Sequence, residues 1–166
     1  SYGEFPNAFL KEELQKLNPG KILFPAEGEG RNAVFAATLG WQTDAFDFSE
    51  AGKKKAIQLA DRHNATIHYT IGKFATYPYP IDYYDAIGLV FVHPAPEMRR
   101  FFFEKLHIAL KPGGVIIFEG FSKNNLELKR QNASVGGPDN IAMLYSMKEI
   151  KDFFPGLQPL ILEEKS

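Results

Sequence analysis

The feature that most limits the possible folds of this chain is a glycine-containing turn between a short apolar run and an amphipathic segment. Residues 22–24 are apolar and predict a buried strand, and residues 28–33 have the pattern G-x-G-x-x-A. A helix is expected over residues 32–39, with Gly40 at its left-handed end. Glycines in such a turn let a ligand approach the backbone, and the helix start attracts negative charge. The pattern predicts a strand–turn–helix unit that holds a ligand.

The rest of the chain continues the alternation of strands and helices. Further strands are expected at residues 43–46, 66–71, 85–92, 115–118 and 160–162, and further helices at residues 7–17, 50–63, 97–110 and 146–154. Short connections between such segments are typical of a parallel sheet with helices on both faces. We therefore expect the α/β class: a doubly wound, mostly parallel Rossmann-like sheet in a three-layer sandwich, with the final C-terminal strand missing.

Composition excludes several kinds of partner and site. The 166 residues carry 19 Lys and Arg against 20 Asp and Glu, a formal charge of −1, so the broad basic field that nucleic acids require is not expected. Without cysteine the chain has no disulfide, thiolate metal site or thiol nucleophile, and His63, His68 and His107 share no metal-ligand spacing, so no metal is expected. Neither a membrane-spanning run of about 18 apolar residues nor a secretory leader is present, which favours a cytoplasmic protein without a membrane partner.

The acidic residues around the turn indicate what kind of ligand it holds. Asp47 ends the second predicted strand, nineteen residues after Gly28, where a carboxylate can accept hydrogen bonds from ribose hydroxyls. Glu27 and Glu29 flank Gly28, and carboxylates repel phosphate but suit a cation. S-adenosylmethionine carries a sulfonium and an ammonium and no phosphate, so these residues favour it over a dinucleotide.

The chain resembles the class I S-adenosylmethionine-dependent methyltransferases in four successive segments. These are residues 24–32, 47–49 and 84–87, and the Leu-Lys-Pro-Gly-Gly sequence at 110–114. A more specific likeness, to the small tellurite-resistance-type subgroup, rests on residues 2–7, 28–32, 119–122, 134–138 and 143–146. The resemblance covers nearly the whole chain. It implies one methyltransferase-like domain over residues 1–166, with an N-terminal helix or lid (1–20), a cofactor-binding core (21–118) and substrate-side and C-terminal elements (119–166).

The resemblance also implies a role for individual residues. The cofactor-binding residues it implies are Glu27, Gly28, Glu29, Gly30, Asn32, Asp47, Phe48, Ser49, Lys73, Phe74 and Phe91. The loop from Glu27 to Gly30 would surround the methionine part, Asp47 would bind the ribose, and Phe48, Lys73 and Phe74 would lie near the adenine. Phe91 and His93 would face the methyl group and the acceptor. His93 is the candidate general base, and a purely structural role for it is an equal alternative.

The predicted function is transfer of a methyl group to a small-molecule acceptor, such as a thiol or a chalcogen anion. The sulfonium is already activated, so the protein's main task is to align donor and acceptor. A non-catalytic module of the same fold is an alternative, because Phe24, Ala26 and Lys73 differ from the acidic residue, the glycine and the second acidic residue usual in the family. A dinucleotide-dependent oxidoreductase is a further alternative. We expect a monomer or a homodimer, with Arg99 and Arg100 on the solvated surface.

Overall fold

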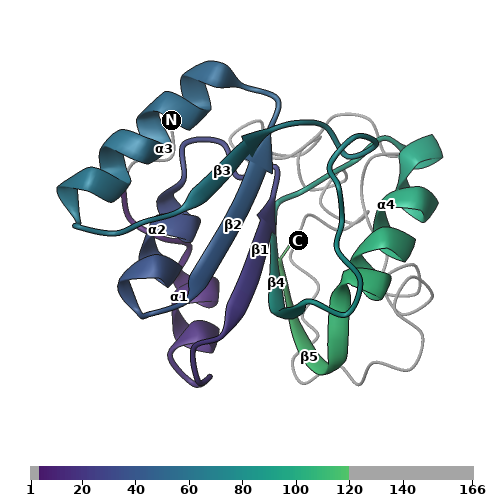
Figure 1. Ribbon diagram of the computed structural model, residues 1–166, viewed down its shortest axis with the longest axis horizontal. Coiled ribbons are helices and arrows are strands. Elements are labelled where there is room, and N and C mark those ends of the chain that lie inside the picture. Colours follow the sequence, from purple (N-terminus) through teal and green to yellow (C-terminus); the bar gives the residue numbers. More distant parts are fainter. Residues whose placement is uncertain (1–3, 120–166) are drawn as a thin grey trace, which may run out of the picture.

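A five-stranded parallel sheet forms the centre of the computed structural model, which describes residues 4–119 (Figure 1). The strands are β1 (Lys21–Pro25), β2 (Gln42–Asp47), β3 (His68–Ile71), β4 (Tyr84–Val90) and β5 (Leu110–Glu119), in the order β3-β2-β1-β4-β5. The helices are α1 (Ala8–Leu14), α2 (Arg31–Thr38), α3 (Glu50–Arg62) and α4 (Pro96–Ala109). The predicted doubly wound α/β fold is confirmed. The expected helix at 146–154, the strand at 160–162 and the missing final strand concern the chain outside the described residues.

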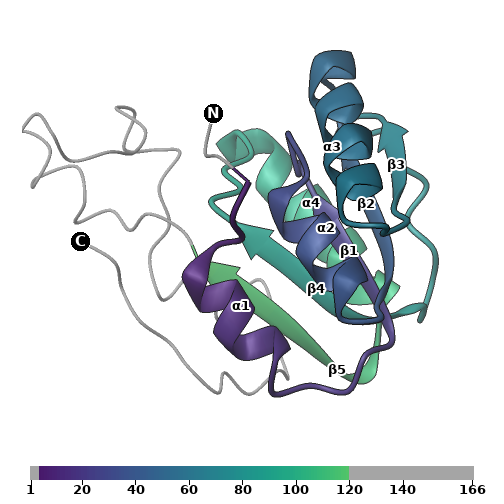
Figure 2. The same cartoon turned by 90° about the vertical axis from the view of Figure 1, so that its left-hand side faces the viewer.

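Alternating side chains of the central strand serve two helix layers. Ile22 and Phe24 of β1 pack in a core cluster with buried residues of α1, α2 and α3. Leu23, which points to the other face, packs in a second cluster with buried residues of α4. Figures 1 and 2 show this arrangement, with α1, α2 and α3 together and α4 across the sheet from them. Because both faces are covered, β1 and β4 are apolar nearly throughout.

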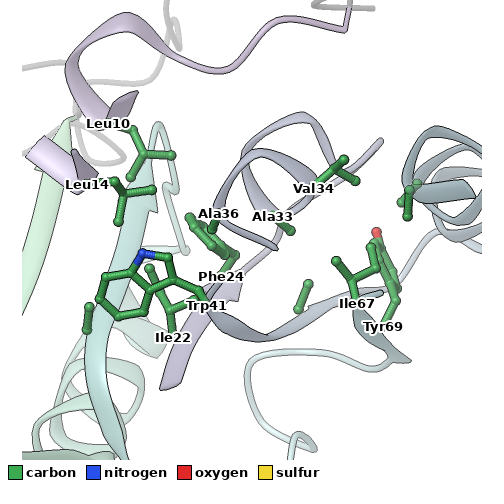
Figure 3. Packing of buried hydrophobic residues seen from close by; sticks show 14 of the residues in the cluster. Leu10, Leu14, Ile22, Phe24, Ala33, Val34, Ala36, Trp41, Ile67 and Tyr69 are labelled. Atoms are coloured by element: carbon green, nitrogen blue, oxygen red, sulfur yellow. The ribbon is translucent and has the colours of Figure 1, made fainter. Parts of the chain in front are cut away.

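Phe24 lies where the resembled family has an acidic residue, and the neighbouring strand accommodates it. Its ring is 1% exposed and lies against α2 in the first cluster (Figure 3). A Cβ added to Gly88 of β4 would lie 2.4 Å from Cε1 of Phe24. The glycine in β4 therefore makes room for the ring, and the two positions form a complementary pair.

Two helix starts follow the predicted capping residues. The side chain of Asn7 accepts a hydrogen bond from the Leu10 N–H at 3.0 Å, and that of Ser49 accepts one from the Gly52 N–H at 2.9 Å. The first helix ends at Leu14, one turn earlier than predicted from the spacing of its leucines. Leu17 nevertheless packs against the first cluster from the turn that follows.

Two expectations about the last described elements are wrong. The predicted turn at 111–114 lies inside β5 as a bulge, because Leu110 already pairs with Tyr84 before Val115 pairs with Ala86. Arg99 is not on the solvated surface: it is 5% exposed, and its Nε donates to the Pro94 carbonyl at 3.4 Å. The reason is that the first turn of α4 presents Arg99 to the protein, whereas its neighbour Arg100 is exposed and pairs with Glu104.

Candidate functional site

A cavity lies at the topological switch point of the sheet, between β1 and β4, where the strand order reverses. From β1 the chain runs through α2 to β2 on one side, whereas β4, the other neighbour of β1, comes later in the chain. Ligands of open α/β sheets bind outside the carboxyl ends of the strands at such a point. The cavity measures about 380 Å³, within the range of about 300–1,000 Å³ usual for ligand sites. Its wall is formed by Ala26, Glu27, Gly28, Glu29, Arg31, Asn32, Ser49, Ala51, Gly52, Lys55, Val90 and Phe91.

The loop between β1 and α2 has a left-handed backbone at Ala26, Gly28 and Gly30. Gly28 and Gly30 have φ angles of 65° and 87°, and Ala26 adopts 51° in spite of its side chain. A Cβ on Gly30 would lie 2.5 Å from the Cβ of Ala56, so this glycine lets α2 and α3 pack closely. A Cβ on Gly28, by contrast, would have no heavy atom of the described residues within 4 Å beyond its chain neighbours. The backbone at Gly28 is therefore open to a ligand.

Asp47 fixes this loop from the end of β2. One carboxylate oxygen accepts a hydrogen bond from the Gly28 N–H at 2.9 Å, and the other accepts one from the Ser49 N–H at 3.2 Å. The residue is 8% exposed and is not among the residues of the cavity wall. Hydrogen bonds to an ionised acceptor contribute about 1.5–3 kcal/mol. In this structure Asp47 thus holds the first turn of the site in place, and its predicted bond to a ribose stays a prediction.

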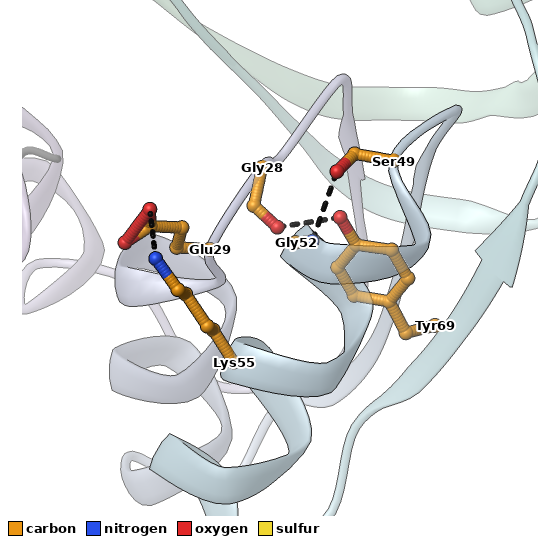
Figure 4. Close-up of polar contacts among 6 residues, drawn as sticks. All are labelled: Gly28, Glu29, Ser49, Gly52, Lys55 and Tyr69. Atoms are coloured by element: carbon orange, nitrogen blue, oxygen red, sulfur yellow. Dashed lines mark hydrogen bonds and ion pairs between the residues drawn. The ribbon is translucent and has the colours of Figure 1, made fainter.

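Gly28 is held from the opposite side by β3 and α3. The Tyr69 hydroxyl donates to the Gly28 carbonyl, and a Cβ on Gly52 would lie 2.9 Å from that same carbonyl oxygen (Figure 4). Burial, followed by the charge of Asp47, raises the pKa of Tyr69, so its hydroxyl stays a proton donor. Gly28 is therefore fixed through both its N–H and its carbonyl, which keeps the loop in one conformation.

Glu27 is a cavity-wall carboxyl in an unusual environment. Its Oε2 accepts a hydrogen bond from the Ala33 N–H, so it supplies the capping acceptor that Gly30 cannot offer to α2. Burial raises the pKa of Glu27 to about 8, although the bond from Ala33 and the charge of Arg31 act in the opposite direction. A carboxyl with a raised pKa in a cavity is typical of a functional site.

The cavity wall also carries an ion pair that the sequence pattern did not predict. Lys55 of α3 reaches across to the loop, where its Nζ lies 3.4 Å from Oε2 of Glu29 (Figure 4). Both side chains are partly exposed to solvent and line the cavity. Lys55 lies on the exposed face of α3, and the close packing of α2 on α3 at Gly30 brings it beside the loop.

The end of β4 supplies the apolar part of the wall. Phe91 lines the cavity with a φ of 52°, an uncommon conformation for an aromatic residue, and its N–H donates to the Glu119 carbonyl at 2.6 Å. His93 follows two residues later and is partly buried outside the wall. The predicted methyl-facing position of Phe91 is therefore at the cavity, while the role of His93 stays a prediction.

The N-terminal segment is tied to the same edge of the sheet. The Asn7 N–H donates to Oδ1 of Asn32 at 2.8 Å, and the Asn7 side chain donates to Oε1 of Glu119 at 3.3 Å. Asn32 is 4% exposed and forms part of the cavity wall. Asn7 was predicted only as a helix cap, and its bond to Asn32 has no signal in the sequence because the two residues lie 25 positions apart.

The structure brings together about half of the predicted site residues. Those on the cavity wall are Glu27, Gly28, Glu29, Asn32, Ser49 and Phe91. Those off the wall are Gly30, which is buried at the α2–α3 contact, Asp47, Phe48, Lys73, Phe74 and His93. Phe48 is 75% exposed just beyond β2, and Phe74 packs against Phe46 and Phe102. Their predicted contacts with an adenine are not tested by this arrangement.

The chemistry of the wall suits an organic ligand better than a metal ion. The described residues contain no group of three or more His, Asp or Glu side chains placed to hold a metal. The cavity wall instead combines the carboxyl groups of Glu27 and Glu29, and the basic Arg31 and Lys55, with the open backbone of Gly28 and the apolar Phe91. Such a surface can hold an organic ligand that carries charged groups of both signs and an extended apolar part.

The sequence places the chain in a family of enzymes. Residues 22–114, which are more than half of the chain and contain the whole cavity wall, match the methyltransferase domain family. The chain therefore belongs to the methyltransferase domain family. No curated protein matches it in sequence.

Solved structures share the fold at low sequence identity. One comes from work on the conversion of a disulfide bond into a thioacetal group during echinomycin biosynthesis, with a TM-score of 0.69, 21% identity and coverage of 90% of this chain and 67% of that one. A protein from Pyrococcus horikoshii OT3 has a TM-score of 0.66, 22% identity and coverage of 74% and 60%. The S-adenosylmethionine-dependent methyltransferase from Geobacter sulfurreducens, in complex with S-adenosyl-L-homocysteine, has a TM-score of 0.65 and 18% identity, and the match covers 92% of this chain and 63% of that one.

These solved structures share the Rossmann-like fold of the chain, but each is longer than the chain. The chain spans 60–67% of the length of the three solved proteins. None of the helices in residues 4–119 has the length and apolar character that crossing a membrane requires.

Proposed function

We propose that this chain is an S-adenosylmethionine-dependent methyltransferase that binds its cofactor in the cavity at the carboxyl ends of β1 and β4. S-adenosylmethionine is its cofactor. The observation that carries the proposal is the acidic loop of a methyltransferase-family domain, held by Asp47 and Tyr69 and open above Gly28. The structural neighbour from Geobacter sulfurreducens, described with S-adenosyl-L-homocysteine bound, supports the same cofactor.

The residues of the wall have complementary tasks in this proposal. Glu27 and Glu29 supply negative charge to the cationic part of the cofactor, while Gly28 offers its open backbone. Phe91 excludes water from the reacting groups. Phe48, exposed beyond β2, would cover the adenine, and Lys73 and Phe74 would lie beside it. Asp47 would accept the ribose hydroxyls while it continues to hold the loop.

When bound, S-adenosylmethionine supplies a methyl group already activated by the sulfonium. The protein therefore contributes mainly alignment, which lowers the barrier of such reactions by several kcal/mol. The loop is suited to this task because Gly28 is fixed through its N–H and its carbonyl. His93 would accept a proton from the acceptor if the acceptor carries one.

The acceptor in this proposal is a small molecule with a strongly nucleophilic atom, such as a thiol or a chalcogen anion. The likeness of residues 28–32 to the tellurite-resistance-type subgroup supports this class. Such anions need no strong general base, which agrees with a cavity wall that has no histidine among the described residues. We further propose that the protein is cytoplasmic and acts as a monomer or a homodimer, without nucleic acid.

A methyl-transfer assay tests the proposal. The purified chain is incubated with S-adenosylmethionine and, in separate reactions, a thiol, selenite and tellurite under reducing conditions, and S-adenosylhomocysteine is quantified. Formation of S-adenosylhomocysteine that depends on one acceptor supports the function. Asp47→Ala should weaken cofactor binding, with Glu50→Gln, an exposed residue outside the cavity wall, as the matched control. Unchanged cofactor affinity in Asp47→Ala would remove the ribose role.

A non-catalytic cofactor-binding module is the second candidate function. The observation that favours it is the departure from the family's pattern in the loop, where Phe24 is buried in the core and Ala26 has a left-handed backbone in place of the family's glycine. Tight binding of S-adenosylmethionine with no transfer to any of the three acceptor classes would select this function.

A further inference from the structure

The environment of Glu27 suggests a role that the binding of S-adenosylmethionine alone does not require. Its backbone N–H donates to the Phe46 carbonyl at 3.1 Å, and its Oε2 caps α2 through the Ala33 N–H. The side chain is therefore held between the sheet and a helix while it forms part of the cavity wall. The hydrogen bond from Ala33 thus holds the carboxyl at the cavity wall.

We infer that Glu27 is a specificity-determining residue that distinguishes the cationic cofactor from its neutral product by gaining and losing a proton. This inference rests on the proposed function. Glu27 is ionised when the positively charged sulfonium form occupies the cavity, and it is protonated when the cavity is empty or holds the thioether product. When the methyl group is transferred, the electron pair of the broken carbon–sulfur bond stays on sulfur. Glu27 then loses its counter-charge and takes a proton from solvent.

The charges around Glu27 permit this exchange at neutral pH. Its pKa of about 8 makes the protonated form dominant at pH 7 in the absence of a ligand. A cation in the cavity lowers the pKa of a neighbouring carboxyl, since an opposite charge favours the ionised form. The other titratable groups around it are Arg31 on α2, Tyr69 on β3, on which Asp47 of β2 also acts, and Lys55 with Glu29 on the cavity wall. The last two form an ion pair and so offset each other.

The Glu27→Gln variant separates the effect of the ionisable proton on ligand binding from the effect of the side chain's shape. The amide oxygen of glutamine can still accept the Ala33 N–H, so the cap of α2 is kept, and the variant resembles the protonated form. We therefore expect Glu27→Gln to bind S-adenosylhomocysteine within about twofold of the unmodified chain, and S-adenosylmethionine about tenfold more weakly, as expected for the loss of one charge interaction. Urea unfolding of the variant verifies that it is folded.

Calorimetry in buffers of different ionisation enthalpy measures the proton directly. At about pH 7, the unmodified chain should release a large fraction of one proton on binding S-adenosylmethionine and a clearly smaller fraction on binding S-adenosylhomocysteine. Glu27→Gln should abolish the difference, and the control Glu50→Gln should keep it. Glu50 is exposed in the first turn of α3 and lies outside the cavity wall.

The possible results separate this inference from the proposed function. If the unmodified chain binds neither ligand, the proposed function fails and the inference fails with it. If both ligands bind but release equal numbers of protons, or if Glu27→Gln weakens both to the same extent, only the inference is overturned.

Discussion

The pairing of Phe24 with Gly88 predicts a large effect of a very small substitution. A Cβ at Gly88 would lie 2.4 Å from Cε1 and 2.7 Å from Cδ1 of the Phe24 ring. Carbon atoms in contact lie about 3.5–4.0 Å apart, so Gly88→Ala requires a movement of about 1 Å or more. Phe24 is 1% exposed and is enclosed in the first core cluster, so a movement of its ring must displace buried neighbours. Overpacking of this kind costs about 1–3 kcal/mol.

The net destabilisation expected for Gly88→Ala is about 1–2 kcal/mol. Alanine restricts the unfolded chain and regains about 0.4–1 kcal/mol of the packing cost. Urea unfolding followed by circular dichroism measures the difference, which corresponds to a fall of about 2–8 °C in Tm for a chain of this size. Gly72→Ala is the matched control, because a Cβ there would lie 3.8 Å from its nearest neighbour, Oγ1 of Thr76.

A double-mutant cycle tests whether the ring itself causes the loss. Phe24→Leu removes part of the ring, so Gly88→Ala should cost at least about 1 kcal/mol less in that background than in the unmodified chain. If the two changes add within about 0.5 kcal/mol, or if Gly88→Ala is as harmless as Gly72→Ala, the reasoning is refuted. In that case the glycine would not explain why a phenylalanine is tolerated at this position.

Three further changes test the loop. Ala26→Gly should stabilise the chain by about 0.5–1 kcal/mol in urea unfolding, since glycine adopts a φ of 51° without strain, and a loss of stability would contradict the observed backbone. Tyr69→Phe should cost about 1 kcal/mol and weaken binding of S-adenosylhomocysteine, because the Gly28 carbonyl loses its donor; unchanged affinity would show that the loop needs no such support. The raised pKa of Glu27 means that the folded state binds its proton more tightly than the unfolded state, so this contribution to stability is complete below about pH 4.5 and is lost as the pH rises to about 8. Glu27→Gln should therefore fall less in stability between pH 5 and pH 8 than the unmodified chain, and parallel urea midpoints for the two proteins would refute the assignment.

Local chemistry made much of the fold predictable. Asn7 and Ser49 cap their helices because a short polar side chain before a helix satisfies a backbone N–H wherever the helix packs. The apolar run of β4 and the glycines of the loop were equally informative. A strand that is covered on both faces is apolar, and a tight turn between a strand and a helix favours glycine. The position of Asp47 at the end of β2 followed from the lengths of these elements.

The parts that were missed depend on packing between distant segments. Lys55 reaches Glu29 only because Gly30 allows α2 to pack closely on α3. The Tyr69 hydroxyl reaches the loop because its side chain points to the buried face of β3, a matter of strand parity that its neighbours in sequence do not fix. Arg99 was placed on the surface because charged residues are rarely buried, and the orientation of α4 overrides that tendency.

The measurement that tests the central claim most directly is calorimetric titration of the purified 166-residue chain with S-adenosylhomocysteine, S-adenosylmethionine and NAD in parallel. The carboxyl groups of Glu27 and Glu29 on the cavity wall predict one site with micromolar affinity for both methionine-derived ligands and no heat from NAD. A chain that binds NAD and neither of the other two would contradict the account, because the carboxylates of Glu27 and Glu29 would then accommodate a pyrophosphate in place of a cation.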